Sequence, residues 1–233
     1  MQISRGSLLP GARAARGIAV IIDVFRAFTC APLMFSLGIE KIILVSTPAE
    51  GFALKDKNPD FILVGEVGGV PIKGFDLGNS PTYILKQDPS FFSARTVVQR
   101  TSSGVQGALA ALEVADEVLL GSYTLAKAAA HYIRTKKAKR VSIVAMGWNL
   151  EVEAPEDEQC ARYIAHLLGK GDYDHNQALR DIIFHETTRK FLRGDKECYP
   201  PSDPILCLQR DIYDFVLRAE CQTDRVTVRK LKL

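Results

Sequence analysis

Acidic side chains that directly follow apolar runs are the residues best placed to do chemistry in this chain. Asp23 closes the run GIAVIID, with Arg26 three residues later, and Glu66 ends the run FILVGE among glycines. If these runs are strands of an open α/β sheet, both carboxylates lie at the carboxyl ends, where ligands bind. A carboxylate there can hold a hard cation, and a guanidinium can bind an anion through two hydrogen bonds. The alternative is that Asp23 only caps the next helical turn and Arg26 is solvated.

Two polar segments could bind an oxyanion beside these carboxylates. In Gly74–Pro81, Asn79, Ser80 and backbone N–H groups could bind the anion while Asp76 faces a metal ion. The same residue types could instead form only consecutive turns. The second segment, Thr101-Ser102-Ser103-Gly104, precedes an Ala-rich helix. Free N–H groups at a helix N-terminus attract anions, although helix capping is the commoner explanation for such residues.

A third set of candidates begins a helix or ends a strand further along the chain. Glu156 and Asp157 follow Pro155, just after the apolar run 140–147. Acids in the first turn after a proline usually complement the helix dipole. They could equally bring two carboxylates to the edge of the sheet. Ser122, at the end of the run EVLLGS, is a weaker candidate of the same kind.

The apolar pattern indicates the elements that must position these residues. Runs rich in β-branched residues, typical of strands buried on both faces, occur at 17–25, 41–46, 61–67, 117–122 and 140–147. Ala-rich, helix-favouring segments lie between or after them, at 104–115, 124–134 and 156–168. This alternation predicts an α/β fold, a three-layer α/β/α arrangement with a mixed, largely parallel sheet.

Two regions have a different composition, and loops are predicted within both. Residues 65–81 are rich in glycine, and the chain becomes polar from residue 169, with loops predicted at 171–174 and 196–204 and a last strand at 225–228. No linker, repeat or low-complexity segment divides the chain. We therefore predict a single domain over residues 1–233.

Composition limits the class of protein and its partners. The 233 residues are 47% apolar and 24% charged, as in globular domains and unlike disordered chains. With 30 Lys+Arg and 27 Asp+Glu, the net charge of +3 is too small to indicate nucleic-acid binding. The basic tail 225–232 has few cations and no aromatic platform for bases. No apolar run approaches the ~20 residues that span a bilayer, so no membrane partner is expected.

The cysteines predict a reducing, cytoplasmic environment. Their number is five, which is odd, and no C-x-x-C pair occurs, so neither a disulfide framework nor a zinc ribbon is indicated. We expect reduced thiols, with Cys30 and Cys160 largely buried.

Motifs of several other enzyme classes are missing. No G-x-G-x-x-G follows a strand and no G-x-S-x-G elbow occurs. The segment 69–74 has P-loop glycine spacing, but Phe75 and Asp76 replace the lysine and hydroxyl residue. No cysteine has an arginine six residues later, as cysteine-dependent phosphatases require, and no two histidines are four residues apart, as in a zinc-protease helix.

Four segments, taken together and in order, carry a resemblance to a known family. Gly74–Pro81 reads G-F-D-L-G-N-S-P, which is that family's signature unaltered. Ile22–Ala27 is similar to its D-V-x-R-A segment, Gly65–Gly69 to its G-E-x-G-G loop, and Glu156–Ala161 to its E-D-x-x-C-A helix start. Over about 20–168 the chain therefore resembles the Mg²⁺-dependent 2-phosphosulfolactate phosphatases and their bacterial relatives.

The resemblance implies hydrolysis of the phosphate ester of a sulfonated lactate, a step toward coenzyme M, with Mg²⁺ as cofactor. The partner would be a small phosphorylated organic acid, and self-association is left open. The implied metal ligands are Asp23, Glu66, Asp76, Glu156 and Asp157. The implied catalytic residues are Asp23, Arg26, Glu66 and Asp76, and the substrate-binding residues are Asn79, Ser80, Thr101, Ser102, Ser103, Gly104 and Ser122.

Three departures from the family pattern keep a second hypothesis open. Val67 stands where the family has the arginine of G-E-R-G-G, and Ser103 replaces the asparagine of T-N-G-T. The C-A-G segment of the family is replaced here by Ala145-Met146-Gly147. Loss of an arginine near an anion site removes a strong contact to phosphate or sulfonate. The alternative is a non-catalytic relative that binds an anionic metabolite, although the retained acids favour the enzyme.

The residue two positions after Asp23 bears on the mechanism. Dehalogenase-type phosphatases have a second aspartate there, and this chain has Phe25. With cysteine and elbow-serine nucleophiles also missing, we predict direct attack of a Mg²⁺-activated water on phosphorus rather than a phosphorylated enzyme.

Overall fold

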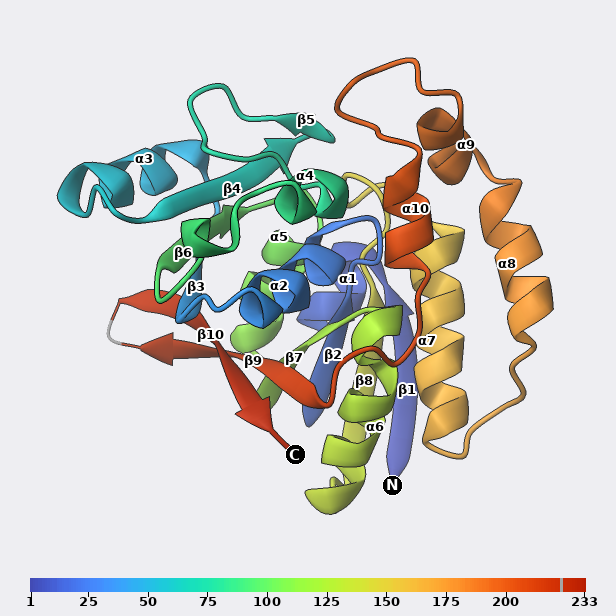
Figure 1. The fold of residues 1–233 in the computed structure, drawn as a ribbon. Coiled ribbons are helices and arrows are strands. Elements are labelled where there is room, and N and C mark those ends of the chain that lie inside the picture. The colour runs from blue at the N-terminus through green and yellow to red at the C-terminus, as the bar shows by residue number, and fades with distance from the viewer. Residues whose placement is uncertain (223) are drawn as a thin grey trace.

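The computed structural model describes residues 1–222 and 224–233, which form a ten-stranded mixed sheet with helices on its two faces (Figure 1). The strand order is β1-β8-β2-β7-β9-β10-β3-β6-β4-β5. The strands are β1 (Gln2–Ser7), β2 (Ile18–Ile22), β3 (Lys41–Leu44), β4 (Ile62–Val67), β5 (Val70–Pro71), β6 (Thr96–Arg100), β7 (Glu117–Gly121), β8 (Arg140–Ala145), β9 (Phe215–Gln222) and β10 (Arg225–Lys232).

Two parallel groups of strands make up most of this sheet. One contains β1, β8, β2 and β7, and the other contains β3, β6 and β4. The antiparallel pair β9–β10 joins them, because β9 pairs with β7 and β10 pairs with β3. The mixed, largely parallel α/β sheet predicted from the buried-type runs is confirmed.

Helices cover both faces of the sheet. They are α1 (Leu8–Arg13), α2 (Ala27–Ser36), α3 (Pro48–Lys57), α4 (Pro81–Leu85), α5 (Gly104–Leu112), α6 (Ala126–Thr135), α7 (Pro155–Leu167), α8 (His175–Ile183), α9 (Glu186–Leu192) and α10 (Ser202–Cys207), with short 3₁₀ helices at Pro89–Phe91 and Tyr123–Leu125. Helices α1 and α5 pack on one face of the first parallel group, and α6 and α7 pack together on the other. Helix α3 packs on β4 and β6.

The largest hydrophobic cluster extends across both parallel groups. It contains Ile21 of β2, Ile42 of β3, Val64 of β4 and Leu217 of β9, all nearly inaccessible to solvent. Residues on the opposite faces of the sheet form separate clusters under α6 and α7 and under α3. A core shared in this way agrees with a single domain, which stays a prediction.

The sequence pattern located the buried strands better than the C-terminal third. The five apolar runs and three Ala-rich segments are strands and helices with bounds within a few residues of those expected. After residue 169, loops at 171–174 and 196–204 and a strand at 225–228 were predicted. The predicted strand is part of β10, but α8, α9, α10 and β9 were not predicted. In particular, α10 begins inside the predicted loop 196–204. These helices have six to nine residues and bury only a few side chains each, so their periodic signal is weak.

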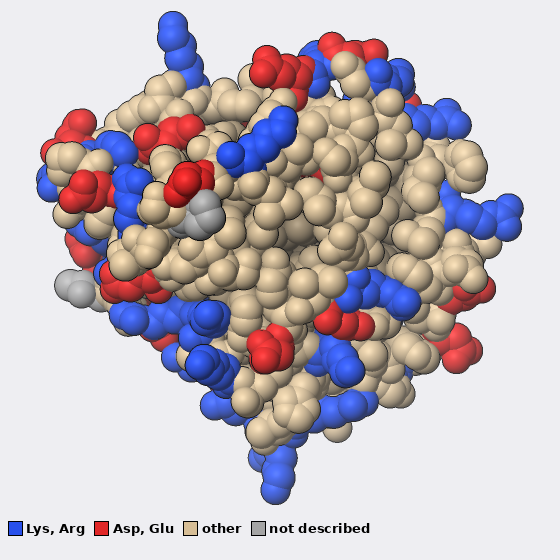
Figure 2. Space-filling view, viewed as in Figure 1, with Lys and Arg blue, Asp and Glu red and all other residues tan. Residues whose placement is uncertain are grey.

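Three further features are the surface charge, the burial of the cysteines and the character of the helices. On the face seen in Figure 2, Lys and Arg side chains gather mainly around the edges, while the centre is largely uncharged. Cys30 and Cys160 are buried, as predicted. Among the described residues, no helix combines the length and apolar character needed to cross a membrane.

Candidate active site

A small cavity of about 30 Å³ lies where residues that follow β2, β6 and β8 meet the end of β4 and the C-terminal segments. Its lining combines acidic, basic, hydroxyl and aromatic side chains from segments far apart in the sequence. The lining residues are Asp23, Phe25, Arg26, Glu66, Gly69, Asn79, Ser102, Ser103, Gly147, Trp148, Asn149, Lys190, Phe191 and Tyr199.

Asp23 follows the last residue of β2 and joins the starts of two helices. Its Oδ1 accepts a hydrogen bond from the Ala27 N–H (3.1 Å) at the start of α2, and its Oδ2 accepts one from the Gly104 N–H (2.8 Å) at the start of α5. The capping alternative is therefore correct in part, because Asp23 caps and also lines the cavity. Burial, with a further contribution from the negative charge of Glu66, raises the pKa of Asp23 to about 6.

Glu66 joins the glycine-rich loop to the loop after β6. Its Oε1 accepts from the Ser102 N–H (2.6 Å), and its Oε2 accepts from the Gly69 N–H (2.5 Å) and the Ser102 hydroxyl (3.1 Å). Gly69 has φ +83°, and an added Cβ would lie 2.3 Å from the Tyr199 hydroxyl oxygen. Only glycine fits there without strain, so the composition of this loop has a direct structural reason.

Glu156 and Asp157 are buried behind the cavity rather than in its lining. Asp157 accepts from the Val24 N–H (2.7 Å) and from the Gly147 N–H (2.8 Å), so it holds the segments that follow β2 and β8. Glu156 accepts from the Thr187 hydroxyl at 2.9 Å. Burial raises the pKa of Asp157 well above its usual range and that of Glu156 to about 7.

Arg26 lines the cavity but is already bonded to protein acceptors. Its Nη1 donates to Asp203 Oδ2 (2.9 Å) and to the Cys198 carbonyl (2.7 Å), and its Nη2 donates to the Gly69 carbonyl (3.2 Å). Both Arg26 and Asp203 are buried. The guanidinium therefore joins three segments that are distant in sequence.

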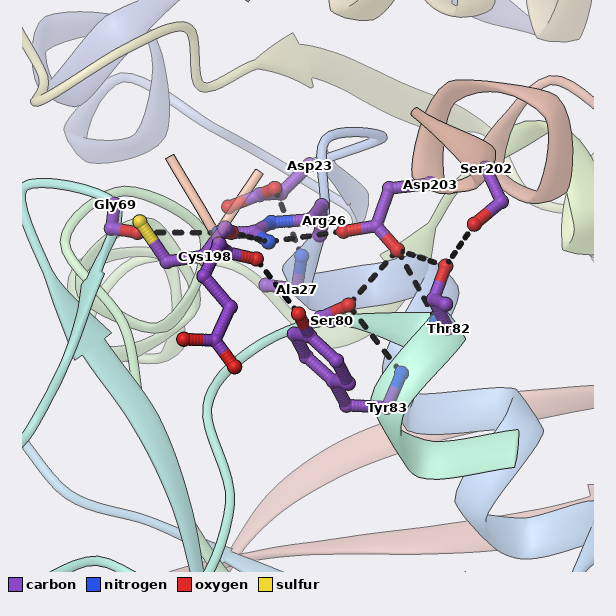
Figure 3. Close-up of polar contacts among 11 residues, drawn as sticks. Asp23, Arg26, Ala27, Gly69, Ser80, Thr82, Tyr83, Cys198, Ser202 and Asp203 are labelled. Atoms are coloured by element: carbon purple, nitrogen blue, oxygen red, sulfur yellow. Dashed lines mark hydrogen bonds and ion pairs between the residues drawn. The ribbon is translucent and has the colours of Figure 1, made fainter. Parts of the chain in front are cut away.

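Asp203, at the start of α10, sits between Arg26 and the start of α4 (Figure 3). While Oδ2 accepts from Arg26, Oδ1 accepts from the Ser80 hydroxyl (2.8 Å), the Thr82 hydroxyl (2.6 Å) and the Thr82 N–H (3.1 Å). One buried carboxylate thus attaches the C-terminal segment to the signature segment that ends at Pro81.

Aromatic rings surround the cations of the cavity. The guanidinium carbon of Arg26 lies 5.3 Å from the ring centroid of Phe191 and 5.5 Å from that of Tyr199. Lys190 Nζ lies 5.1–5.4 Å from the ring centroids of Phe191, Tyr199 and Trp148. Apolar walls of this kind strengthen electrostatic interactions, because they exclude water from the charged groups.

The structure brings together only some of the residues singled out in the sequence. Asp23, Arg26, Glu66, Asn79, Ser102 and Ser103 line the cavity, and the Gly104 N–H contacts Asp23. Asp76 does not join them: it pairs with Lys55 (3.1 Å) and accepts from the Leu63 N–H (2.7 Å). Leu63 is near the start of β4, whereas Glu66 is near its end. Asp76 therefore holds the loop against the strand, away from the other acids.

Three hydroxyl residues from the predicted set are also outside the lining. Ser80 caps α4 and donates to Asp203, and Thr101 Oγ1 accepts from the Val105 N–H (3.1 Å) inside α5. Ser122 Oγ lies 2.8 Å from Thr124 Oγ1. Their buried hydroxyls are used within the protein, as the capping and turn alternatives predicted.

Sequence reasoning missed the C-terminal part of the site. Lys190, Phe191 and Tyr199 line the cavity, and Asp203 holds Arg26, yet all four lie after residue 169, in the region interpreted only as polar. A lysine and two aromatic residues within ten positions were the available signal. Nothing in that spacing indicates that α9 and α10 contact Phe25 and Arg26, which follow β2. Trp148 and Asn149 were missed for the same reason.

Oxygen donors suited to a hard cation are present in the cavity. The buried Asn79 Oδ1 has no hydrogen-bond partner within the described part of the chain, and it shares the lining with Asp23 and Glu66. No group of three or more His, Cys, Asp or Glu side chains in residues 1–222 and 224–233 forms a metal-binding cluster. Mg²⁺ commonly uses one or two carboxylates, waters and substrate phosphate rather than a complete protein cage, so this donor set fits it.

Comparisons with known proteins point to one family. The family model described as 2-phosphosulpholactate phosphatase matches residues 5–220. A probable 2-phosphosulfolactate phosphatase of Bacillus subtilis is 32% identical over 217 residues, which cover 92% of each chain. A protein of the same name from Caldicellulosiruptor saccharolyticus is 31% identical over 91% of both chains. Another, from Deinococcus radiodurans, is 33% identical over 70% of this chain and 67% of the relative.

Proposed function

The chain belongs to the 2-phosphosulpholactate phosphatase family, and from this membership we propose that it hydrolyses the phosphate monoester of 2-phosphosulfolactate to sulfolactate and phosphate. The observation that carries the proposal is the cavity itself. It places the buried carboxylates of Asp23 and Glu66 beside the buried guanidinium of Arg26 and the hydroxyls of Ser102 and Ser103. Phosphoryl transfer needs this combination of oxygen donors and positive charge around the transferring group.

We propose Mg²⁺ as the cofactor, held by oxygens of Asp23, Glu66 and Asn79. The unpartnered Asn79 Oδ1 and the two carboxylates supply hard donors in one lining. When bound there, Mg²⁺ would neutralise charge on phosphoryl oxygens and acidify water. Glu156 and Asp157 would support the site from behind, since they hydrogen-bond to Thr187, Val24 and Gly147 instead of facing the cavity.

The chain's own groups would orient the substrate and exclude water. Glu66 fixes the Ser102 backbone, and Asp23 fixes the start of α5, so the hydroxyls of Ser102 and Ser103 are held at the cavity. Phe191 and Tyr199 shield the cations from solvent on the other side. Preorganised groups of this kind stabilise charge in the transition state without moving during the reaction.

Water is the proposed nucleophile. Ser80, a hydroxyl of the signature segment, donates its hydrogen bond to Asp203 and is not in the lining. Both Asp23 oxygens accept hydrogen bonds from backbone N–H groups, and these bonds hold the carboxylate in place. These contacts favour positioning roles for both residues over covalent attack on phosphorus.

The non-catalytic alternative draws little support from the arrangement. Val67, where the family has arginine, is 50% exposed and is not in the lining, so the cavity of this chain forms without a side chain from this position. Ser103 does line the cavity, and it keeps a hydroxyl where the family has an amide.

Phosphate release from 2-phosphosulfolactate tests the proposal. The purified protein should release phosphate with added Mg²⁺, and EDTA should stop the release. Asp23→Asn should remove the activity, whereas Asp76→Asn, which alters a carboxylate outside the lining, should retain most of it. Binding of 2-phosphosulfolactate without any release of phosphate would instead support the non-catalytic alternative.

A further inference from the structure

Two cations line the cavity, and among the residues that the structure describes only Arg26 forms an ion pair. Arg26 is paired with Asp203 and donates to the carbonyls of Cys198 and Gly69. Lys190 forms no ion pair and donates no side-chain hydrogen bond within residues 1–222 and 224–233. Its ammonium is therefore the cation in the lining that is available to an anion from outside.

The position of Lys190 is fixed although its charge is unpaired. Its Nζ lies against the faces of Trp148, Phe191 and Tyr199 at 5.3, 5.4 and 5.1 Å from the ring centroids. One turn earlier in α9, Thr187 donates to the buried Glu156, which attaches the helix to the start of α7. A lysine held by aromatic rings loses little side-chain entropy when it binds a ligand.

Partial burial of this ammonium has an electrostatic cost that an anion would offset. Partial removal from water lowers the pKa of Lys190, although the negative charge of Glu156 acts in the opposite direction. A partly buried charge without a hydrogen-bonding partner is unfavourable. An anionic oxygen at this place would supply that partner.

The lining also separates two regions of the site. Asp23, Glu66 and Ser102 come from the ends of strands, whereas Lys190 belongs to α9 and lies against Trp148, which is 45% exposed. Lys190 Nζ lies 5.3 Å from the ring centroid of this exposed Trp148. A phosphorylated acid whose phosphate lies at the strand ends would therefore meet Lys190 where it extends toward Trp148.

We propose that Lys190 binds an anionic group of the substrate other than the phosphate, namely its carboxylate or its sulfonate. This inference rests on the proposed function for the identity of the substrate. Lys190 would then determine which substrate is bound. Removal of its side chain should weaken binding of the intact substrate without slowing the chemical step.

Kinetics with two phosphate esters test this role. Lys190→Met should raise KM for 2-phosphosulfolactate about 10- to 100-fold and leave kcat within about twofold, as expected for loss of one charged hydrogen bond. Lys190→Arg should retain most of the affinity. With 2-phospholactate, which lacks the sulfonate, KM should be unaffected by Lys190→Met if the sulfonate is the bound group and should rise if the carboxylate is.

A control and a binding measurement separate this inference from the proposed function. Arg189→Met removes a cation from the same helix but outside the lining, so it should leave KM unchanged. Calorimetry with sulfolactate, which has no phosphate, should show binding to the unaltered protein and about 10- to 100-fold weaker binding to Lys190→Met. Thermal unfolding would show whether each variant is folded.

The possible results separate the role of Lys190 from the proposed phosphatase activity. A fall in kcat for both esters with unchanged KM, or unchanged kinetics, would overturn the role of Lys190. Failure of the unaltered protein to release phosphate would overturn the proposed function alone, and the sulfolactate measurement would then decide the inference. Sulfolactate that binds equally well to both proteins, or to neither, would contradict it.

Discussion

Gly104 and Asp23 are 81 residues apart in the chain, and the Gly104 N–H donates to Asp23 Oδ2 at 2.8 Å. A Cβ added at Gly104 would lie 2.6 Å from that same oxygen, which is closer than van der Waals contact permits. The start of α5 can therefore approach the carboxylate only because residue 104 has no side chain. Gly104 is therefore needed to position the Asp23 carboxylate, which follows β2.

Gly104→Ala should displace the Asp23 carboxylate and reduce phosphate release by at least about tenfold, since sub-ångström placement matters in a preorganised site. Gly107→Ala is the matched control, one turn along α5. There the added Cβ meets the flexible side chain of Met146 instead of a cavity residue. Initial rates and thermal unfolding should be measured for both variants. Equal activity in the two would show that the position of Asp23 is not critical.

Two carboxylates at opposite ends of β4 offer a second comparison. Glu66→Gln removes an acceptor that serves three donors from Ser102 and Gly69, so it should abolish most activity and loosen both loops. Asp76→Asn alters a partly exposed pair with Lys55 and should cost under about 1 kcal/mol of stability. Steady-state kinetics and urea unfolding would measure both effects. Greater loss of activity in Asp76→Asn would restore Asp76 as a site residue.

The sequence predicted those parts of the site that depend on local pattern. Asp23 and Glu66 could be placed at the ends of strands because apolar runs directly precede them. The prediction for Asp76 rested on its signature segment, but a motif does not show where each side chain points. Asp76 lies one residue before the bridge between Leu77 and Val64, so it meets the start of β4 instead of its end.

The C-terminal contributions could not be predicted, because they depend on long-range packing. Arg26 and Asp203 are 177 residues apart, and neither has a local partner that signals the other. Lys190 reaches the cavity because Thr187 attaches α9 to Glu156. Interactions of this kind follow from the fold, and a single sequence contains no periodic signal for them.

The buried pair of Arg26 and Asp203 should contribute strongly to stability. Asp203→Asn leaves the buried guanidinium without its carboxylate and should lower the free energy of unfolding by about 3–5 kcal/mol, with loss of activity. The double variant Arg26→Met/Asp203→Asn should recover part of the stability but not the activity, because Arg26 lines the cavity. Arg193→Met, which breaks exposed pairs, serves as control. A change no larger than that of the control would contradict the expected coupling.

Stability should depend on pH through Glu156. Burial raises its pKa from 4.5 to about 7, so the folded state favours the protonated form. The contribution of Glu156 to stability is therefore fully present below about pH 4.5 and is lost as the pH rises toward 7. Glu156→Gln is neutral throughout and should gain stability relative to the unaltered protein over that range. Urea unfolding in EDTA at several pH values measures the difference, and a constant difference would rule out this titration.

The mechanism predicts that no phosphorylated enzyme accumulates. The lining hydroxyls belong to Ser102, Ser103 and Tyr199. Ser102 donates to Glu66 and Tyr199 donates to the Gly68 carbonyl, so water remains the favoured nucleophile. Acid-quenched reaction mixtures should show unmodified protein by mass spectrometry.

Asp23→Asn should lose activity and recover part of it in excess Mg²⁺, because an amide is a weaker cation ligand than a carboxylate. Asparagine can accept only one of the two N–H bonds that Asp23 receives without a donor clash. The variant should therefore also be less stable by about 1–3 kcal/mol, and its unfolding must be followed with and without Mg²⁺ to separate folding from catalysis. A phosphoryl group trapped on Asp23 or on any serine of the cavity would refute direct attack by water.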